Sequence, residues 1–226
     1  MKKRSILFVI TGMIIVWAAG CKEMDEKFIS EGEIEYSAKV IDPNNPMASM
    51  APSKLTVRFK SDKSAAEMSA GLGLFSTSFI ADPEKRTVTQ LVKILNKKFV
   101  LVQNQQSIDK ENLNYSFKFI PTKQTKIIAG YKCTKVEVVP DDKSIPPFDL
   151  YYTDELDIKD PNFASPFKEI KGVLMEYQLK KFGLEMRFEA KSIRKEQIED
   201  KYFQVPPDYK PVSEKEMRRI FDDLQM

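Results

Sequence analysis

From residue 31 onward, apolar and polar residues alternate with a period of two, which is typical of β-strands that bury one face. Residues 33–40 and 54–60 follow this alternation without an error. The same pattern returns in residues 173–180 and 184–191, on either side of a predicted turn near Gly183. Weaker alternating segments fill most of the chain between them, and the helical period of a βαβ unit is missing there. The pattern predicts a meander of about eleven antiparallel strands.

One helix is predicted at the carboxyl end of the chain. Ser213 and Glu216 have the spacing of a capping box. A weaker helical stretch is predicted within residues 161–171, and residues 104–114 are predicted to form a polar loop. The apolar stripe of the terminal helix consists of Met217, Ile220, Phe221 and Leu224.

The balance of apolar surface predicts how these elements assemble. The predicted strands bring about thirty inward apolar residues, whereas the terminal helix offers only the four of its stripe. A single helix of about 18 Å is too short to cover a flat sheet of that size. We therefore expect a mainly β fold, in which a strongly curved antiparallel sheet forms a half-barrel with the helix as a plug or lid. Whether the interior is filled by side chains or is hollow for an apolar ligand stays open.

Composition excludes several classes of function. The chain has 226 residues, of which 42% are hydrophobic and 31% charged, as in folded soluble domains. It contains no histidine, which removes Ser-His-Asp and Cys-His catalytic systems and zinc sites that need imidazole. Without its first 20 residues the chain keeps 33 basic residues (36 minus 3) and 33 acidic residues, a net charge of zero. Nucleic acid is not expected as a partner, because phosphate binding needs a basic excess.

The amino terminus has the pattern of a bacterial lipoprotein signal. Three basic residues precede an apolar run at residues 6–19, which is too short for a membrane-spanning helix. Small residues then lead directly to Cys21, as in a lipobox, where this cysteine is acylated and becomes the first mature residue. An uncleaved anchor helix with an incidental Cys21 is the alternative. We expect a signal peptide at residues 1–20, a lipidated tether at 21–30 and a single curved-sheet domain at 31–226.

This signal places the protein in the bacterial cell envelope. Acyl chains on Cys21 would attach it to a membrane without inserting the domain. Lys22 differs from the aspartate that retains some lipoproteins in the inner membrane, so the outer membrane is expected. The charged residues 22–27 are either a solvated linker or similar to signals that send lipoproteins to the cell surface. The choice between the periplasmic and the surface face stays open.

Two short motifs carry a family resemblance. Residues 127–133, Ile-Ile-Ala-Gly-Tyr-Lys-Cys, open a predicted strand, and residues 205–209, Val-Pro-Pro-Asp-Tyr, precede the terminal helix. With the lipobox and the alternating strands, they resemble a group of envelope proteins similar to the outer-membrane lipoprotein carrier and receptor proteins, LolA-like and LolB-like. The resemblance covers most of the mature chain. It implies a half-barrel with helices capping an apolar cavity that binds acyl chains or another hydrophobic molecule, and it implies no catalytic residues and no cofactor.

The candidate cavity residues are aromatic side chains in the inward phase of the clearest strands. Tyr36 and Tyr177 are the more discriminating, because a tyrosine inside an apolar cavity needs a partner for its hydroxyl. Ordinary core packing is the alternative for every candidate. The candidate cavity-lining residues are Tyr36, Phe59, Phe117, Tyr177 and Phe188.

Few residues offer reactive chemistry. Cys133 follows Lys132 and could be a reactive thiol, an intermolecular disulfide partner or a buried apolar residue. The adjacent carboxylates Asp141 and Asp142 do not have the ligand spacing of a calcium loop. No metal site and no catalytic residue is predicted.

These observations favour a non-enzymatic envelope lipoprotein that binds a lipid, an acyl chain or a similar apolar ligand in its curved sheet. The alternative is a structural or interaction module of an envelope complex with a filled interior. An enzyme that uses serine, lysine or carboxylates is a third hypothesis. The sequence does not identify the ligand, a protein partner or the oligomeric state.

Overall fold

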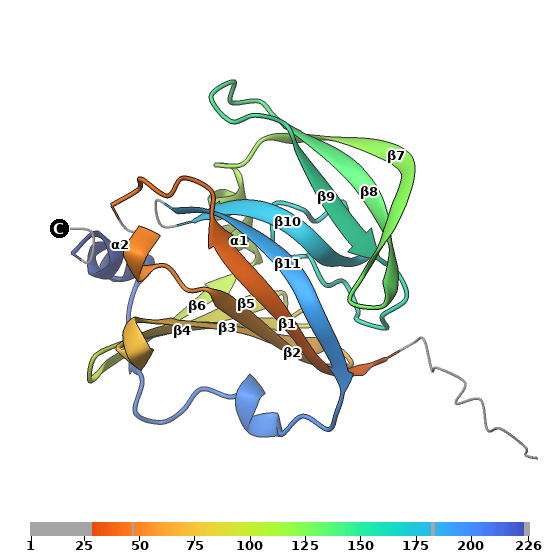
Figure 1. The fold of residues 1–226 in the computed structure, drawn as a ribbon. Coiled ribbons are helices and arrows are strands. Elements are labelled where there is room, and N and C mark those ends of the chain that lie inside the picture. Colours follow the sequence, from red (N-terminus) through yellow and green to blue (C-terminus); the bar gives the residue numbers. More distant parts are fainter. Residues whose placement is uncertain (1–28, 47, 182–183, 224–226) are drawn as a thin grey trace, which may run out of the picture.

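The computed structural model describes residues 29–46, 48–181 and 184–223 of the chain (Figure 1). The predicted signal peptide, Cys21, most of the tether, Gly183 and Leu224 lie outside the described residues. The strands are β1 (Glu31–Val40), β2 (Lys54–Lys60), β3 (Lys63–Ala70), β4 (Phe75–Asp82), β5 (Thr87–Ile94), β6 (Lys97–Asn104), β7 (Phe117–Ile128), β8 (Tyr131–Pro140), β9 (Phe148–Thr153), β10 (Val173–Lys181), β11 (Leu184–Lys195) and β12 (Lys210–Pro211). The helices are α1 (Gln105–Asn112) and α2 (Glu214–Asp222), with short 3₁₀ turns η1 (Ala48–Met50), η2 (Gly71–Gly73) and η3 (Asp200–Phe203).

All strands belong to one 12-stranded sheet in the order β12-β6-β5-β4-β3-β2-β1-β11-β10-β9-β8-β7. Neighbours are antiparallel, except that β12 runs parallel to β6. Strand β1 pairs with β2 on one side and with β11 on the other, so an early and a late strand meet at the centre of the sheet. In Figure 1 the half made of β2–β6 and the half made of β7–β10 bend toward each other on either side of β1 and β11. This open, strongly curved sheet confirms the predicted fold class.

Two details of the strand prediction change. The twelfth strand, β12, has only two residues, which is too short to show any periodicity. Residues 127–133, predicted to open a strand, instead contain the end of β7, a tight turn and the start of β8. Ala129 and Gly130 form that turn with φ values of 49° and 87°, between the paired residues Ile128 and Tyr131.

The helices lie at the two open margins of the curved sheet. The predicted capping box is present at α2, where the Ser213 hydroxyl accepts from the Glu216 amide. Residues predicted as a polar loop form α1, which Asn104 caps by accepting from Ser107 N at 3.0 Å. Helix α1 buries a single side chain, Ile108, so its apolar stripe is too narrow to be visible in the sequence.

The helix predicted within residues 161–171 is wrong: this segment is a series of turns. The buried Asn162 holds it in place, because its Nδ2 donates to Ile170 O at 2.7 Å and to Gly172 O at 2.8 Å. A side-chain amide that satisfies backbone carbonyls removes the need for helical hydrogen bonds in this stretch.

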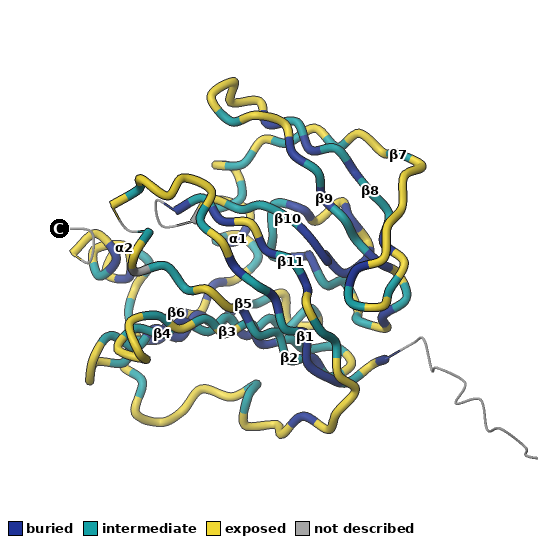
Figure 2. The backbone as a smooth tube through the Cα atoms, viewed as in Figure 1, coloured by how far each residue is buried: buried dark blue, intermediate teal, exposed yellow. Residues whose placement is uncertain are grey.

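The hydrophobic core is divided between the two faces of the sheet. On the inner face, the main core joins β1, β2, β8, β10 and β11. On the outer face, residues 196–212 cross β3–β6 and place Phe203 and Tyr209 against Leu91 and Val100. Figure 2 shows buried positions along the strands, with most of the crossing segment exposed. Strand β5 is therefore covered on both faces, which explains why its sequence alternates less cleanly than that of β1.

Candidate functional site

An apolar cavity of about 590 Å³ lies inside the curve of the sheet. Its floor is the inner face of β2–β5 and includes Val57, Ala66 and Phe79. Its roof is formed by β1, β10 and β11 and includes Tyr36, Tyr177 and Phe188. The volume is within the range of small-molecule sites. The interior, which the sequence left undecided, is therefore hollow.

Elements outside the regular strands close the two ends of this cavity. At one end, α2 places Phe221 against Phe75, with ring centroids 6.2 Å apart, and both side chains line the cavity. At the other end, α1 contributes Ile108, and the loop after β9 contributes Phe163. The sequence did not assign α1 or this loop to the cavity. The available signal is the aromatic pair Phe163 and Phe167 in an otherwise turn-rich segment, whose spacing of four residues also fits a helical stripe.

Three aromatic residues form the roof near the centre of the sheet. The Tyr36 hydroxyl donates to Leu174 O at 2.8 Å, so this buried tyrosine has the partner it needs. Its ring packs edge-on against Tyr177, at 6.2 Å, and Tyr177 stacks on Phe188 at 5.0 Å. Burial raises the pKa of Tyr36 and of Tyr177 well above the ordinary tyrosine value. Both hydroxyls are therefore neutral at physiological pH.

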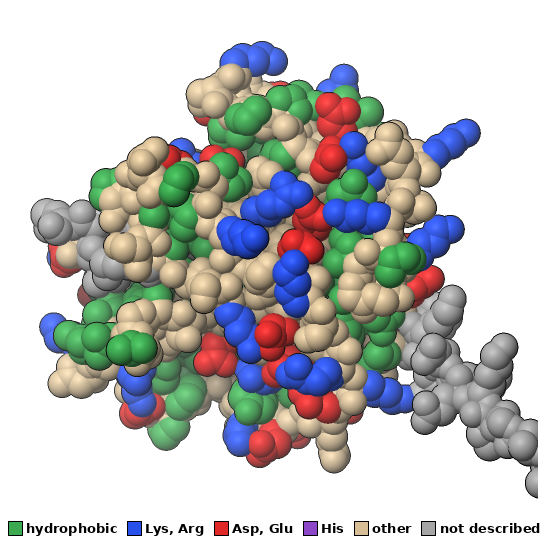
Figure 3. Space-filling view, viewed as in Figure 1, with side chains coloured by type: hydrophobic (Ala, Val, Ile, Leu, Met, Phe, Trp, Pro, Cys, Tyr) green, Lys and Arg blue, Asp and Glu red, His purple; other side chains and the backbone are tan. Residues whose placement is uncertain are grey.

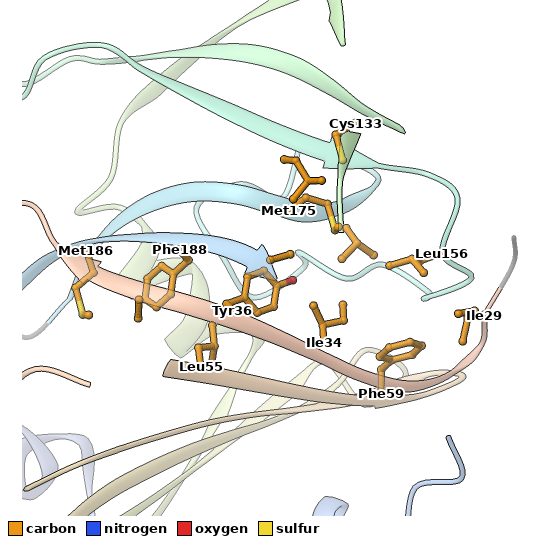
Figure 4. Packing of buried hydrophobic residues seen from close by; sticks show 14 of the residues in the cluster. Ile29, Ile34, Tyr36, Leu55, Phe59, Cys133, Leu156, Met175, Met186 and Phe188 are labelled. Carbon is orange, nitrogen blue, oxygen red and sulfur yellow. The ribbon is translucent and has the colours of Figure 1, made fainter. Parts of the chain in front are cut away.

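The structure places the five predicted lining residues in three different environments. Tyr36, Tyr177 and Phe188 line the cavity. Phe59 is instead fully buried in the main core, near Ile29 in Figure 4. Phe117 stacks on Phe167 at 5.5 Å, in a packed cluster formed with β8–β10, and is outside the lining. Strand periodicity identifies the inward face, but it does not tell how far along the strand the cavity extends.

The open margin beside α2 carries exposed leucines on two adjacent hairpin tips. Leu72, Leu74 and Leu95 have exposed fractions of 106%, 58% and 60%. The two tips are in contact, since Leu95 N donates to Leu74 O at 2.7 Å. Leu74 and Leu95 also line the cavity. The apolar lining thus continues onto the surface at this margin, where Figure 3 shows hydrophobic side chains at the edge of the molecule.

The cavity lining has little charge. Among the described lining residues, Glu111 of α1 is the only one with a charged side chain, and Gln103 Nε2 donates to its Oε2 at 2.9 Å. Within the described ranges, no cluster of three or more cysteine, aspartate or glutamate residues is arranged to hold a metal ion. None of the described helices is long and apolar enough to span a membrane.

The outer face of the central strands is very different from the cavity. Glu176 is 2% exposed and forms ion pairs with Lys126 and Arg187. Glu33 is likewise buried and pairs with Arg58 at 3.0 Å. Figure 3 shows basic and acidic side chains side by side over this face. These charges neutralise one another, and the apolar side chains of these central strands lie on the inner face.

Cys133 lies in the main core with no exposed surface, close to Met175 in Figure 4. Burial raises the pKa of its thiol to about 11. At pH 8 about one thiol in a thousand is then ionised, and the thiolate is the reactive form. This environment fits a buried apolar residue rather than a nucleophile.

Cys133 should therefore resist modification in the folded protein. In residues 22–226 it is the only cysteine, so labelling by an aromatic disulfide reagent reports on this position alone. We expect labelling at pH 8 to be about 100-fold slower in the folded protein than in concentrated guanidinium chloride. Equal rates, with folding verified by circular dichroism, would show that the thiol is accessible.

Comparison with known protein families shows which family the chain belongs to. Residues 33–168, more than half of the chain, match the family model described as N-glycanase peptide, N-terminal domain. The chain belongs to this family. The resemblance to LolA-like and LolB-like proteins is supported only at the level of a β-rich, open-sheet fold. No curated protein matches the sequence of this family member.

One solved structure agrees with the assignment of the fold. The structure of PNGF-II superposes with a TM-score of 0.52 and 16% identity, over 86% of this chain and 32% of that chain. This chain therefore spans about a third of the length of PNGF-II. The MucA/MucB complex of Pseudomonas aeruginosa aligns with a TM-score of 0.35 and 12% identity, over 83% of this chain and 59% of that chain. That second likeness is too weak to establish a shared fold.

Proposed function

We propose that the protein is a non-enzymatic binding domain whose cavity takes an apolar ligand, such as an acyl chain. The observation that supports this most directly is the cavity of about 590 Å³ with its almost uncharged lining. Burying an apolar ligand there gains about 25 cal/mol for each Å² removed from water. Tyr36 on the roof is neutral, and its hydroxyl already donates a hydrogen bond to Leu174 O, so this tyrosine is not activated as a base or a nucleophile.

The sequence of the first 28 residues supports attachment of this domain to the bacterial envelope. The basic head, the apolar run at residues 6–19 and Cys21 have the pattern of an acylated lipoprotein. We propose that residues 21–30 tether the domain to the outer membrane. Palmitate labelling of cells that express the wild type or Cys21→Ala tests this attachment, and equal labelling would contradict it.

A second candidate is an interaction domain, and the family favours it more directly than it favours ligand binding. The family is described as an N-terminal domain, and the similar PNGF-II chain is about three times as long as the aligned part. In such a protein the fold lies beside other domains. The exposed Leu72, Leu74 and Leu95 offer a surface for such a contact. The predicted filled interior does not fit this structure, but a surface contact does not require it.

A ligand-binding experiment tests the first candidate. Residues 22–226 contain every strand, helix and core cluster described above, so this segment is suitable once circular dichroism shows that it is folded. We expect native mass spectrometry to detect a co-purified apolar molecule, and a neutral hydrophobic dye to bind with one site after organic extraction. Failure of both would reject the proposed ligand site.

Crosslinking in intact membranes tests the second candidate. We expect a discrete crosslinked partner that is lost in the variant Leu72→Ser/Leu95→Ser and retained in Ile127→Ser. Ile127 is a suitable control because it is 68% exposed on β7, at the opposite edge of the sheet. A partner that survives the leucine changes would reject this surface.

A further inference from the structure

Two buried polar atoms on the inner face have no hydrogen-bond partner among the described residues. They are Thr77 Oγ1 in β4 and Gln90 Nε2 in β5. Their residues are 3% and 4% exposed, so bulk water does not satisfy them. An unpaired buried polar group is costly, and nearly all such groups in folded proteins find a partner. Two of them on neighbouring strands therefore need an explanation.

The strand register brings these two side chains together beside the cavity. Thr77 pairs with Val92, and Gln90 pairs with Phe79, so Thr77 and Gln90 are diagonal neighbours on one face of the β4/β5 ladder. Diagonal neighbours in an antiparallel pair are about 7–8 Å apart at Cα, within reach of one shared ligand group. Thr77 lines the cavity floor, whereas Gln90 lies next to it outside the lining, so a ligand reaches Gln90 Nε2 only after a change of the glutamine rotamer. We name Thr77 and Gln90 the polar floor.

The groups around the polar floor restrict the charge of whatever binds there. The described lining contains no lysine or arginine, and its one charged residue is the acidic Glu111. An anionic head group would thus be buried without a cation and would face a carboxylate, which is unfavourable. Tyr36 and Tyr177 do not add charge, because burial keeps both phenols neutral. A neutral polar group avoids this cost.

The hydrogen-bonding character of the polar floor restricts the ligand further. A glutamine Nε2 can only donate, and a threonine hydroxyl can donate or accept. A carbonyl oxygen satisfies both, since it accepts two hydrogen bonds. Most of the remaining lining, including Val57, Ala66 and Phe79 on the floor, is apolar.

We propose that the cavity binds an uncharged amphipathic lipid, in which a carbonyl group of an ester or amide accepts hydrogen bonds from the polar floor while its hydrocarbon chain fills the remaining volume. This inference depends on the proposed ligand site and specifies the chemical class of its ligand. It favours a neutral acyl ester over a free fatty acid, which is ionised at pH 7, and over a plain alkane.

Displacement of a neutral hydrophobic dye from residues 22–226 tests the proposal with three ligands of equal chain length: 1-monopalmitoylglycerol, palmitate and hexadecane. We expect the ester to bind about tenfold more tightly than either of the others, since each hydrogen bond made to a buried unpaired group adds to affinity. The double variant Thr77→Val/Gln90→Leu should abolish this preference and leave hexadecane affinity unchanged. The control is Thr89→Val, on the opposite face of β5, which should keep the preference.

The melting temperature of the ligand-free protein gives an independent readout. Thr77→Val replaces an unpaired hydroxyl with a methyl group of similar size, so we expect a higher melting temperature than in the wild type. A lower value would show that Oγ1 makes a structural bond and would overturn the inference.

The possible outcomes distinguish a failure of the polar floor from a failure of the ligand site itself. If the wild type binds all three ligands equally, or if the double variant keeps the preference for the ester, the polar floor has no role and the apolar site still stands. Tighter binding of palmitate would also overturn the inference. If the folded wild type binds none of the ligands and no dye, the ligand site itself is rejected.

Discussion

Ala66→Trp should lower the affinity for an apolar ligand by about tenfold or more, because the indole would occupy the centre of the cavity. Ala66 lies on the cavity floor in β3, paired with Val57 and Phe79 of the neighbouring strands, which also line the cavity. A large side chain here removes volume and contact area that the ligand would use. Because the cavity of about 590 Å³ has room for it, we expect the free energy of unfolding to stay equal or to rise.

The fluorescence of the same variant shows whether its new indole is buried in the cavity. The chain has a single tryptophan, Trp17, so residues 22–226 contain none. A buried indole at position 66 should therefore fluoresce at shorter wavelength than an exposed one. The control is Ser69→Trp, in the same strand and exposed to solvent, which should bind ligand like the wild type. Unchanged affinity in Ala66→Trp, with blue-shifted emission, would show that the ligand binds elsewhere.

The inner face of the sheet is the part of the fold that the sequence predicted best. Ile34, Tyr36 and Ala38 alternate with polar residues in β1, and all three are buried. Alternation is this clear only where one face of a strand is covered and the other carries charges, as with Glu35 and Lys39. The curl of the sheet followed from the amount of apolar surface rather than from any local motif.

The closing elements of the cavity could not be predicted in this way. Helix α1 depends on one cap, Asn104, and one buried side chain, Ile108, and neither is distinctive in the sequence. The loop after β9 depends on hydrogen bonds from Asn162 to residues eight and ten positions away. Such contacts become visible only when the fold brings the residues together.

For the site residues, too, the sequence predicted which face of the strand they are on, but not whether they reach the cavity. Tyr36 and Phe59 are both in the inward phase, but Phe59, which is opposite Gly32, lies in the packed main core. Tyr36 lies farther along the sheet, where the two halves separate and the cavity begins. Thr77 and Gln90 could not be identified from the sequence, because a polar residue at an inward position looks the same there as a break in the alternation of a strand.

Gly172→Ala should destabilise the protein by about 3 kcal/mol, because the added methyl group has no room. A Cβ at this position would lie 2.5 Å from Thr153 O and 2.6 Å from Tyr152 Cδ2. The first of these atoms belongs to the backbone of β9, which cannot move without breaking its pairing with β10. Asn162, which donates to Gly172 O, would lose its position as well.

Gly130→Ala is the matched control, because it separates crowding from backbone conformation. Gly130 has φ of 87°, and no neighbouring atom lies within 4 Å of the point that a Cβ would occupy, so alanine there costs only the conformational penalty of about 1 kcal/mol. Urea unfolding of both variants measures the difference. Equal losses of unfolding free energy in the two variants would mean that the backbone of β9 shifts at little cost to make room for a methyl group at Gly172. A larger loss in Gly172→Ala than in Gly130→Ala, together with weaker dye binding, would show that the close approach of β9 and the loop after it holds the wall of the cavity in place.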